Sequence, residues 1–249
     1  MGKVKTVAFV EILFETIRLL KMNVLPLIVN TVLFFPALCV PYINLGACAG
    51  MVSLPAKMAK GEKIDPLEIF KSEYRKGFNE LFIVFAAMSA IYYLTTKAVT
   101  ASRKFVIFWH GGYYGRLAAI VAILIAVNFG VFFVSWMLAP ILVKDKDVKA
   151  LDALSQSSEY MCGNRLLFAL FGVVYGLAVW VIVSIIALIP HMHVIKFPVF
   201  AVLFTPVLLC MQSYCYRMFV IDADSEKTDA DVSEKCDNDS SNEVIPEIL

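Results

Sequence analysis

Acidic residues are missing from two long stretches of this sequence. None occurs between Glu80 and Asp145, and none occurs between Glu159 and Asp222. Because an ionised side chain at the centre of a bilayer costs roughly 3 kcal/mol or more, apolar sequence is kept free of carboxylates where it crosses a membrane. Hydrophobic residues make up 60% of the 249 positions, and the mean hydropathy is +0.76. The sequence therefore predicts an integral membrane protein.

The motifs of the common enzyme and cofactor-binding classes are also missing. The chain contains no P-loop, G-x-S-x-G, H-E-x-x-H or dinucleotide-binding fingerprint, and its six cysteines form no C-x-x-C pair. No carboxylate or histidine falls at the predicted bilayer depth, where an intramembrane enzyme or a proton-coupled carrier would need one. We therefore expect a protein that is not an enzyme, with no cofactor and no nucleic-acid partner.

The remaining apolar sequence predicts an all-α fold, a polytopic helical membrane bundle. Its transmembrane domain covers residues 23–221 and contains about six spans, at 24–42, 43–59, 81–101, 117–143, 166–189 and 197–221. The first pair has two interpretations. Pro36 and Pro41 interrupt it, and Gly46 and Gly50 allow either a closely packed second span or a re-entrant segment.

The two ends of the chain differ from this domain. Residues 1–22 predict an amphipathic helix in the membrane interface, with Glu11, Glu15 and Arg18 on its polar face. Residues 222–249 contain ten acidic residues and two lysines, a net charge of −8, and predict a disordered cytoplasmic tail. With the N-terminus inside, 17 of the 22 Lys and Arg residues face inward and five face outward. This bias predicts cytoplasmic termini.

The two inner loops share a pattern that suggests an internal duplication. Pro55 precedes Gly77 by 22 residues, and Pro140 precedes Gly163 by 23; Asn79 or Asn164 follows. Each loop carries a helical apolar stripe, which predicts an amphipathic helix at the membrane interface: Leu67, Phe70, Tyr74, Phe78 and Leu81 in the first, and Leu151, Leu154, Ser158 and Met161 in the second. The alternative is that ordinary cytoplasmic loops are often basic and amphipathic.

Few polar side chains are candidates for a site. Asn128 and Gln212 lie inside predicted spans, where they either line a substrate path or make hydrogen bonds between helices. The three histidines, His110, His191 and His193, all fall in predicted outer loops and are candidate zinc or copper ligands. The alternative for them is a place among interfacial aromatic residues, since no carboxylate accompanies them outside.

The second loop resembles a known group of proteins. The run Pro140-Ile141-Leu142-Val143, the Ala150–Ala153 region, Ser157 and the segment GNRLLFAL resemble an uncharacterised family of bacterial six-span integral membrane proteins. That family is related to the membrane domain of glycerophosphodiester phosphodiesterases. Gly46, Gly61-Glu62, Gly77-Phe78 and Pro206 also agree, so the resemblance covers about residues 20–220, although Cys162 stands where the family has a lysine. It implies a bacterial inner-membrane protein and carries over no catalytic residue.

These observations favour a structural or interaction protein that binds membrane lipids or other membrane proteins. The alternative is a transporter or permease-like component for a lipid or another amphipathic solute, suggested by the apparent duplication. Solute flux after reconstitution would distinguish the two functions.

Overall fold

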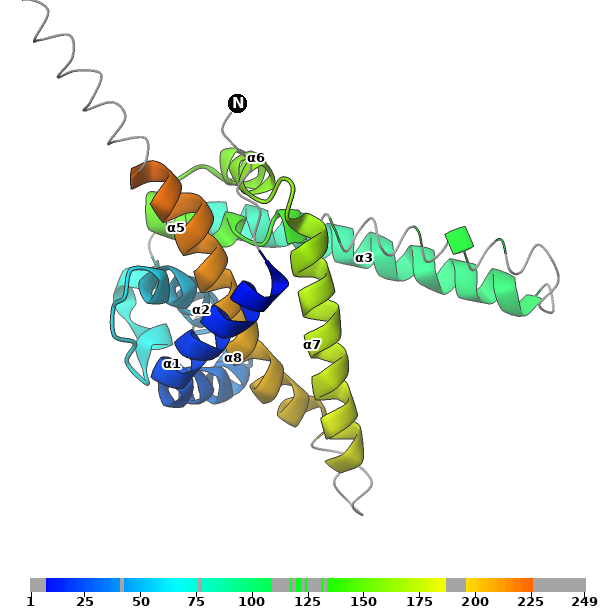
Figure 1. Cartoon of the computed structure of the whole chain (residues 1–249), viewed down its shortest axis with the longest axis horizontal. Helices are drawn as coiled ribbons and strands as arrows, with labels where there is room; N and C mark the ends of the chain where they lie inside the picture. Colours follow the sequence, from blue (N-terminus) through cyan, green and yellow to red (C-terminus); the bar gives the residue numbers. More distant parts are fainter. Residues whose placement is uncertain are drawn as a thin grey trace, which may run out of the picture.

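The structure is a computed structural model that describes residues 8–40, 43–75, 78–108, 134–186 and 196–225, together with the single positions 117, 120, 121, 124 and 131. Every regular element in these ranges is helical (Figure 1). The α-helices are α1 (Phe9–Leu38), α2 (Ile43–Ala59), α3 (Phe78–Phe108), α5 (Ala139–Lys146), α6 (Ala150–Tyr160), α7 (Arg165–Ile186) and α8 (Lys196–Tyr216). Two 3₁₀ helices, η1 (Glu68–Phe70) and η2 (Ser72–Arg75), follow α2, and a π-helix (Arg217–Ile221) follows α8.

Four helices are long and apolar enough to cross a membrane. They cover residues Phe9–Leu38, Phe78–Ala101, Arg165–Ile185 and Pro198–Ser225. Their outer surfaces carry large exposed apolar side chains, such as Leu94 on α3 and Leu177 and Trp180 on α7. Such surfaces are unfavourable in water and suited to lipid. The expected membrane class and helical fold agree with these features, whereas α2, with 17 residues, is not one of the four helices.

Helix α1 is continuous through the expected boundary between an interface helix and a first span. It runs from Phe9 to Leu38 with Pro26 and Pro36 inside it. Its apolar residues Val10, Leu13 and Ile17 are exposed, so they are available to lipid. Residues 1–7 and the acidic tail beyond Ser225 lie outside the described residues.

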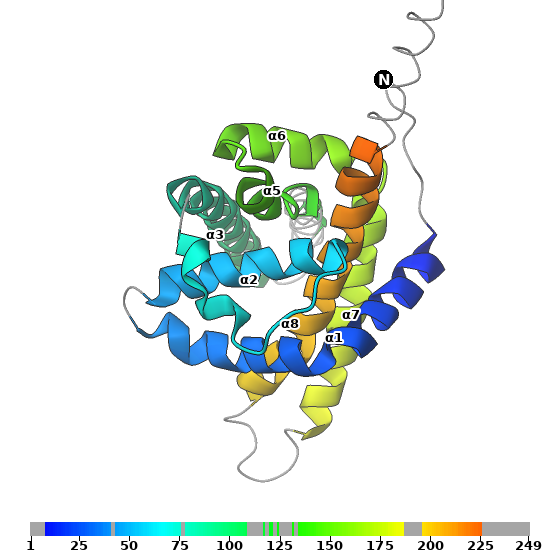
Figure 2. The ribbon, with the colours of Figure 1, turned by 90° about the vertical axis from the view of Figure 1, so that its left-hand side faces the viewer.

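Helix α2 lies in the centre of the molecule, in contact with α1, α5, α8 and the 3₁₀ segment (Figure 2). Most of its residues are buried, including Gly46, Ala47, Ala49 and Gly50. A Cβ atom at Gly50 would lie 2.5 Å from the Cα atom of Ile69, so glycine is required for the η1 backbone to approach this closely. Close packing, one of the two interpretations of this glycine pair, is what the structure shows at Gly50.

The expected fourth span, 117–143, is wrong at its inner end. Residues Trp136–Leu138 form turns, and a separate helix, α5, begins at Ala139 and continues to Lys146. Pro140 occupies the first turn of α5, where the missing N–H of proline has no cost and its fixed φ favours a helix start. Pro140 therefore marks the beginning of a helix and not the end of a span.

The expected amphipathic stripes of the two loops are correct in part: Tyr74, Leu81, Leu154 and Met161 are buried as expected. The first loop forms η1 and η2 instead of an α-helix, and Leu67 and Phe70 remain 61% and 40% exposed. The second loop does form a helix, α6, but Leu151 is 75% exposed. The buried face of α6 includes Leu154 as expected, but its other members, Ala150, Ala153 and Ser157, each lie one residue before an expected position. Helix α6 packs against α5 and α3.

Candidate functional site

An apolar cavity of about 680 Å³ lies between α2, α3, α5, α7 and α8. Its wall includes Phe85 from α3, Ile141 from α5, Phe168 from α7, and Leu208 and Met211 from α8. Its volume falls within the roughly 300–1,000 Å³ of typical ligand pockets, which are also mainly apolar with a few polar groups. The cavity is therefore large enough for a ligand with a long apolar part.

The arrangement of α3 and α7 leaves this space open. The two helices leave the region of α5 and α6 in different directions (Figure 1). Gly172 on α7 forms part of the wall, and no heavy atom of the other described elements lies within 4 Å of the position that its Cβ would occupy. Three polar side chains, Ser89, Tyr92 and Gln212, accompany the apolar lining.

A polar hollow of about 270 Å³ lies about one helical turn further along α2 and α5. Val52 and Ile141 line the apolar cavity, whereas Ala56 and Asp145, four residues later on each helix, line the polar hollow. Its charged lining is balanced between three lysines and three acids: Lys57, Lys60, Lys144, Glu62, Glu73 and Asp145. The α2–α5 pair is therefore lined by an apolar cavity followed by a polar hollow. This order matches an amphipathic molecule, which has an apolar part and a polar end.

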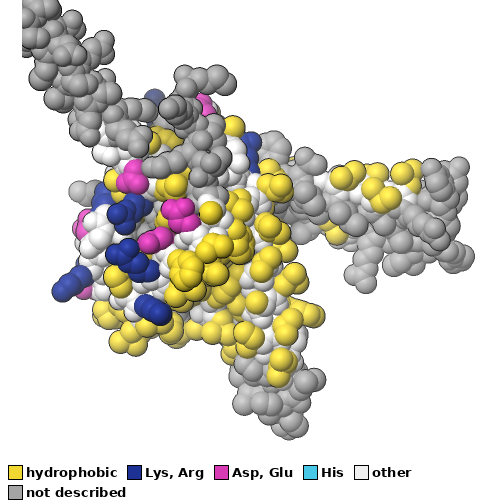
Figure 3. Space-filling model, viewed as in Figure 1, with side chains coloured by type: hydrophobic (Ala, Val, Ile, Leu, Met, Phe, Trp, Pro, Cys, Tyr) yellow, Lys and Arg dark blue, Asp and Glu magenta, His cyan; other side chains and the backbone are white. Residues whose placement is uncertain are grey.

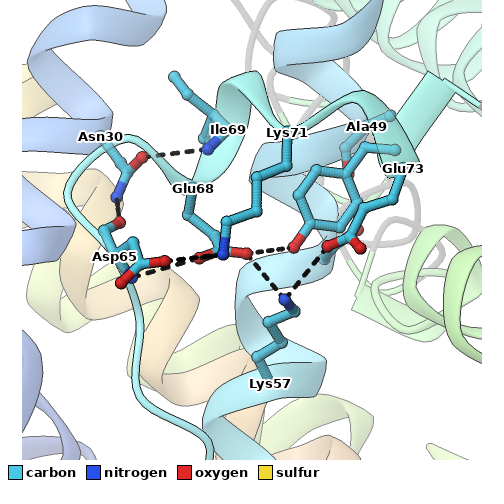
Figure 4. Close-up of polar contacts among 10 residues, drawn as sticks. Asn30, Ala49, Lys57, Asp65, Glu68, Ile69, Lys71 and Glu73 are labelled. Atoms are coloured by element: carbon cyan, nitrogen blue, oxygen red, sulfur yellow. Dashed lines mark hydrogen bonds and ion pairs between the residues drawn. The ribbon is translucent and has the colours of Figure 1, made fainter.

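The charged residues beside the polar hollow form a network around the buried carboxylate of Glu68 (Figure 4). Lys57 Nζ contacts Glu68 Oε1 at 2.7 Å, Lys71 Nζ donates to Oε2 at 2.8 Å, and the Tyr74 hydroxyl donates to Oε1 at 2.5 Å. The backbone N–H of Asp65 donates to Oε2 at 3.2 Å. Both carboxylate oxygens are thus satisfied, which a buried charge requires.

These contacts determine the ionisation of Glu68. Burial by itself would raise its pKa, but the hydrogen bonds from Lys57, Lys71 and Tyr74 lower the pKa from 4.5 to about 2. The pKa of Lys71 is raised above its ordinary value by its hydrogen bonds to Asp65 and Glu68. The carboxylate therefore stays ionised near neutral pH and is suited to structural pairing rather than to proton transfer.

Asn30 attaches the same loop to α1. Its side-chain amide donates to the carbonyl oxygen of Asp65 at 2.9 Å and to that of Pro26 at 2.8 Å, and its Oδ1 accepts from the N–H of Ile69 at 3.2 Å. Figure 4 shows Asn30 facing the η1 segment across these bonds. Asn30 and Glu68 together hold the first loop against α1 and α2.

The second loop is held by two polar contacts of a different kind. The Ser157 hydroxyl donates to the carbonyl of Ser135 at 2.7 Å and accepts from the N–H of Leu138 at 3.2 Å, bridging the turn before α5. Glu80 of α3 accepts a hydrogen bond of 2.8 Å from the N–H of Ala150, in the first turn of α6. A carboxylate at a helix N-terminus satisfies a free donor and complements the helix dipole.

The residues predicted from the sequence lie in several places. Pro140 and Gln212 line the apolar cavity, and Tyr74 joins the Glu68 network. Pro55, Leu154 and Asn164 are buried, while Phe78 begins α3 and is half-buried. Gly163 has a φ of 85° directly before Asn164 and α7, so the predicted turn into that span is present. Phe70 and Leu151 face outward.

Five predicted residues lie outside the described residues: Gly77, His110, Asn128, His191 and His193. Their proposed roles remain predictions. Within the part of the chain that the structure describes, no group of three or more His, Cys, Asp or Glu residues is placed to hold a metal ion.

Most of the cavity wall was not predicted. The wall includes residues that are far apart in sequence, such as Phe85, Phe168 and Met211. Because these residue types are common throughout membrane helices, only the packing of the helices identifies them as cavity residues. Gly172 does carry a signal in the sequence, since a glycine within an apolar span often marks a close packing contact. The role of Glu68 was also not predicted from the sequence, because its partner Lys57 is 11 residues away.

The comparisons with known proteins add no further information on the site. No protein-family model, no curated protein and no solved structure matches the chain.

Proposed function

We propose that this protein is a membrane lipid-binding interaction protein, in which one acyl chain occupies the apolar cavity. The observation that carries the proposal is the cavity of about 680 Å³ between α2, α3, α5, α7 and α8, lined mainly by apolar side chains. An apolar space of this size among lipid-exposed helices favours a hydrocarbon chain over water, because water there would find few hydrogen-bonding partners.

The polar hollow supports an orientation for the lipid. Lipid tails are as apolar as leucine, so moving a chain from bilayer to cavity gains little hydrophobic free energy. Selectivity must therefore come from packing and from the polar end of the ligand. The polar hollow at the end of the α2–α5 pair offers both signs of charge to a headgroup. Its charged lining includes Lys57, Glu73, Lys144 and Asp145.

Photocrosslinking in membranes tests the proposal. A phospholipid with a diazirine in one acyl chain should label peptides that contain Ile141 and Met211. Gly172→Phe fills the cavity wall, its Cβ meets no other described element within 4 Å, and it should reduce this labelling at least five-fold. Val174→Phe, on the exposed side of the same helix, is the matched control and should leave labelling unchanged. Equal labelling in both variants would refute the proposal.

Transport of an amphipathic solute is the second candidate, and Gln212 favours it. Its side chain is half-buried and lines the cavity, where a polar group adds little to acyl-chain binding. Transport would be supported by flux of a fluorescent phospholipid in proteoliposomes. This flux should be lost in Gln212→Leu and retained in Gly176→Ala. Gly176 is outside the cavity lining, and a Cβ there meets Phe204 at an ordinary 3.5 Å.

Two similarities support the proposal of an internal duplication. Each central helix, α2 or α5, is followed by a loop that packs back on it, and then by a long apolar helix, α3 or α7. The two central helices also contact each other. On this proposal, the chain has six spans and belongs to the bacterial inner-membrane group that its second loop resembles. Both termini are cytoplasmic on the same proposal.

A further inference from the structure

A charged groove runs between α1 and the C-terminal end of α8, away from the lining of the apolar cavity. It consists of two adjoining hollows of about 270 and 310 Å³ that share Glu15, Arg18 and Arg217. Lys/Arg and Asp/Glu side chains lie next to one another on the face of the molecule in Figure 3. The two hollows are called the acidic lobe and the basic lobe below.

The basic lobe has a surplus of positive charge. Arg18, Lys60 and Arg217 line it against one acid, Glu15. Lys60 also pairs with Asp145, and Arg18 contacts Glu15 at 3.4 Å. The side chain of Arg217 makes no hydrogen bond or ion pair with any other residue that the structure describes. Arg217 is thus available to an anion, and guanidinium groups bind phosphate with paired hydrogen bonds.

The acidic lobe has the opposite balance. Glu11, Glu15 and Asp222 line it against the same two arginines. Tyr214, only 7% exposed, also lines it. Its hydroxyl lies near Glu11 but makes no hydrogen bond to any described residue. A buried hydroxyl without a partner is destabilising unless a ligand or water satisfies it.

The helices on both sides of the groove have features that support binding: a charged face on α1 and a π-helix after α8. On α1 the charged residues Glu11, Glu15 and Arg18 line the groove, while apolar residues of the same turns are exposed. On the other side, Arg217 begins a π-helix of five residues. Such π-segments are rare in proteins, and those that do occur are often found at functional sites.

We propose that this groove binds the headgroup of an aminophospholipid, which carries a phosphodiester and a primary ammonium. The phosphodiester lies in the basic lobe, against Arg18, Lys60 and Arg217. The ammonium lies in the acidic lobe, where three carboxylates accept its hydrogen bonds. Basic pockets between transmembrane helices are known sites for lipid headgroups, and the adjoining acidic lobe adds a preference for a zwitterion.

Native mass spectrometry of the full-length protein in detergent tests this proposal. Dioleoyl phosphatidylethanolamine should bind at least ten-fold more tightly than dioleoyl phosphatidylglycerol, which lacks the ammonium, and dioleoyl phosphatidylcholine, whose ammonium has no N–H. Inorganic phosphate and O-phosphoethanolamine, added as competitors, separate a lipid site from a site for a free anion. Neither should displace the lipid at equal concentration.

Matched variants locate the site. Arg217→Gln and Glu11→Gln change exposed side chains and should each weaken phosphatidylethanolamine binding about ten-fold. Lys21→Gln, exposed on α1 outside both lobes, should not. Equal affinity for the three lipids, equal binding by Arg217→Gln and Lys21→Gln, or displacement by inorganic phosphate would overturn the proposal. Gly172→Phe should leave this binding intact, which separates it from the proposed function of the cavity.

Discussion

The Cα atom of Ile69 lies 2.5 Å from the position that a Cβ on Gly50 would occupy. This contact places the backbone of η1 directly against α2, the central helix. Ile69 itself is fully buried, and its N–H is bound by Asn30. Because the opposing atoms belong to backbone, neither segment can move aside cheaply.

We predict that Gly50→Ala lowers the stability of the protein, by roughly 2 kcal/mol or more, because the new methyl group overpacks a backbone contact. Gly172→Ala is the matched control, since its Cβ meets open space within a helix; alanine there should be neutral or stabilising by up to about 1 kcal/mol. Thermal unfolding in detergent measures both. Similar melting temperatures for the two variants would contradict the close approach.

Glu68→Gln should destabilise the protein by about 1–3 kcal/mol, because the hydrogen bonds from Lys57 and Lys71 lose their charged, buried acceptor. Glu73→Gln is the control: this side chain is mostly exposed, and its contact to Lys57 is 3.5 Å long, so its loss should be small. Equal losses of melting temperature in the two variants would show that the network does not centre on Glu68.

Stability should also depend on pH through Glu68. The pKa of this carboxyl falls from 4.5 to about 2 on folding, so its contribution is fully present above pH 4.5 and is lost as the pH falls toward 2. The difference in melting temperature between wild type and Glu68→Gln should therefore shrink across this range. A difference that stays constant between pH 7 and pH 3 would be inconsistent with a lowered pKa.

Ser157→Ala should cost about 1–3 kcal/mol, because it leaves the N–H of Leu138 and the carbonyl of Ser135 without their buried partner. Ser155→Ala, exposed on the same helix, should have no measurable effect on thermal unfolding. We also expect proteolysis near residues 136–138 to increase only in Ser157→Ala. Unchanged protease resistance and stability would mean that Ser157 does not hold the turn.

The two inner loops should be on the same side of the membrane. Lys144 Nζ donates to the carbonyl of Tyr74 at 2.9 Å, and Lys60 pairs with Asp145. Cysteines at the exposed positions Lys63 and Lys149 should therefore react with an impermeant maleimide only when the cytoplasmic side is accessible, and one at Lys97 only from outside. Labelling of Lys63→Cys and Lys149→Cys from opposite sides would contradict the fold.

The sequence by itself determined the membrane class and the approximate positions of the long apolar helices. Spans predicted at 81–101, 166–189 and 197–221 coincide closely with α3 (Phe78–Phe108), α7 (Arg165–Ile186) and α8 with its π-helix (Lys196–Ile221). These features follow from local composition, because a long run without carboxylates has few stable environments other than the bilayer.

Only the tertiary structure decided how the shorter elements are arranged. The turn before α5 depends on Ser157, from a helix that comes later in the chain, and the first loop depends on Asn30 and Lys57, which lie on two different helices. The cavity likewise requires five helices to meet. Hydrophobic periodicity describes one segment at a time, so contacts between distant segments leave no trace in it. For this reason Leu151 was placed on the buried face that Ala150 and Ala153 occupy.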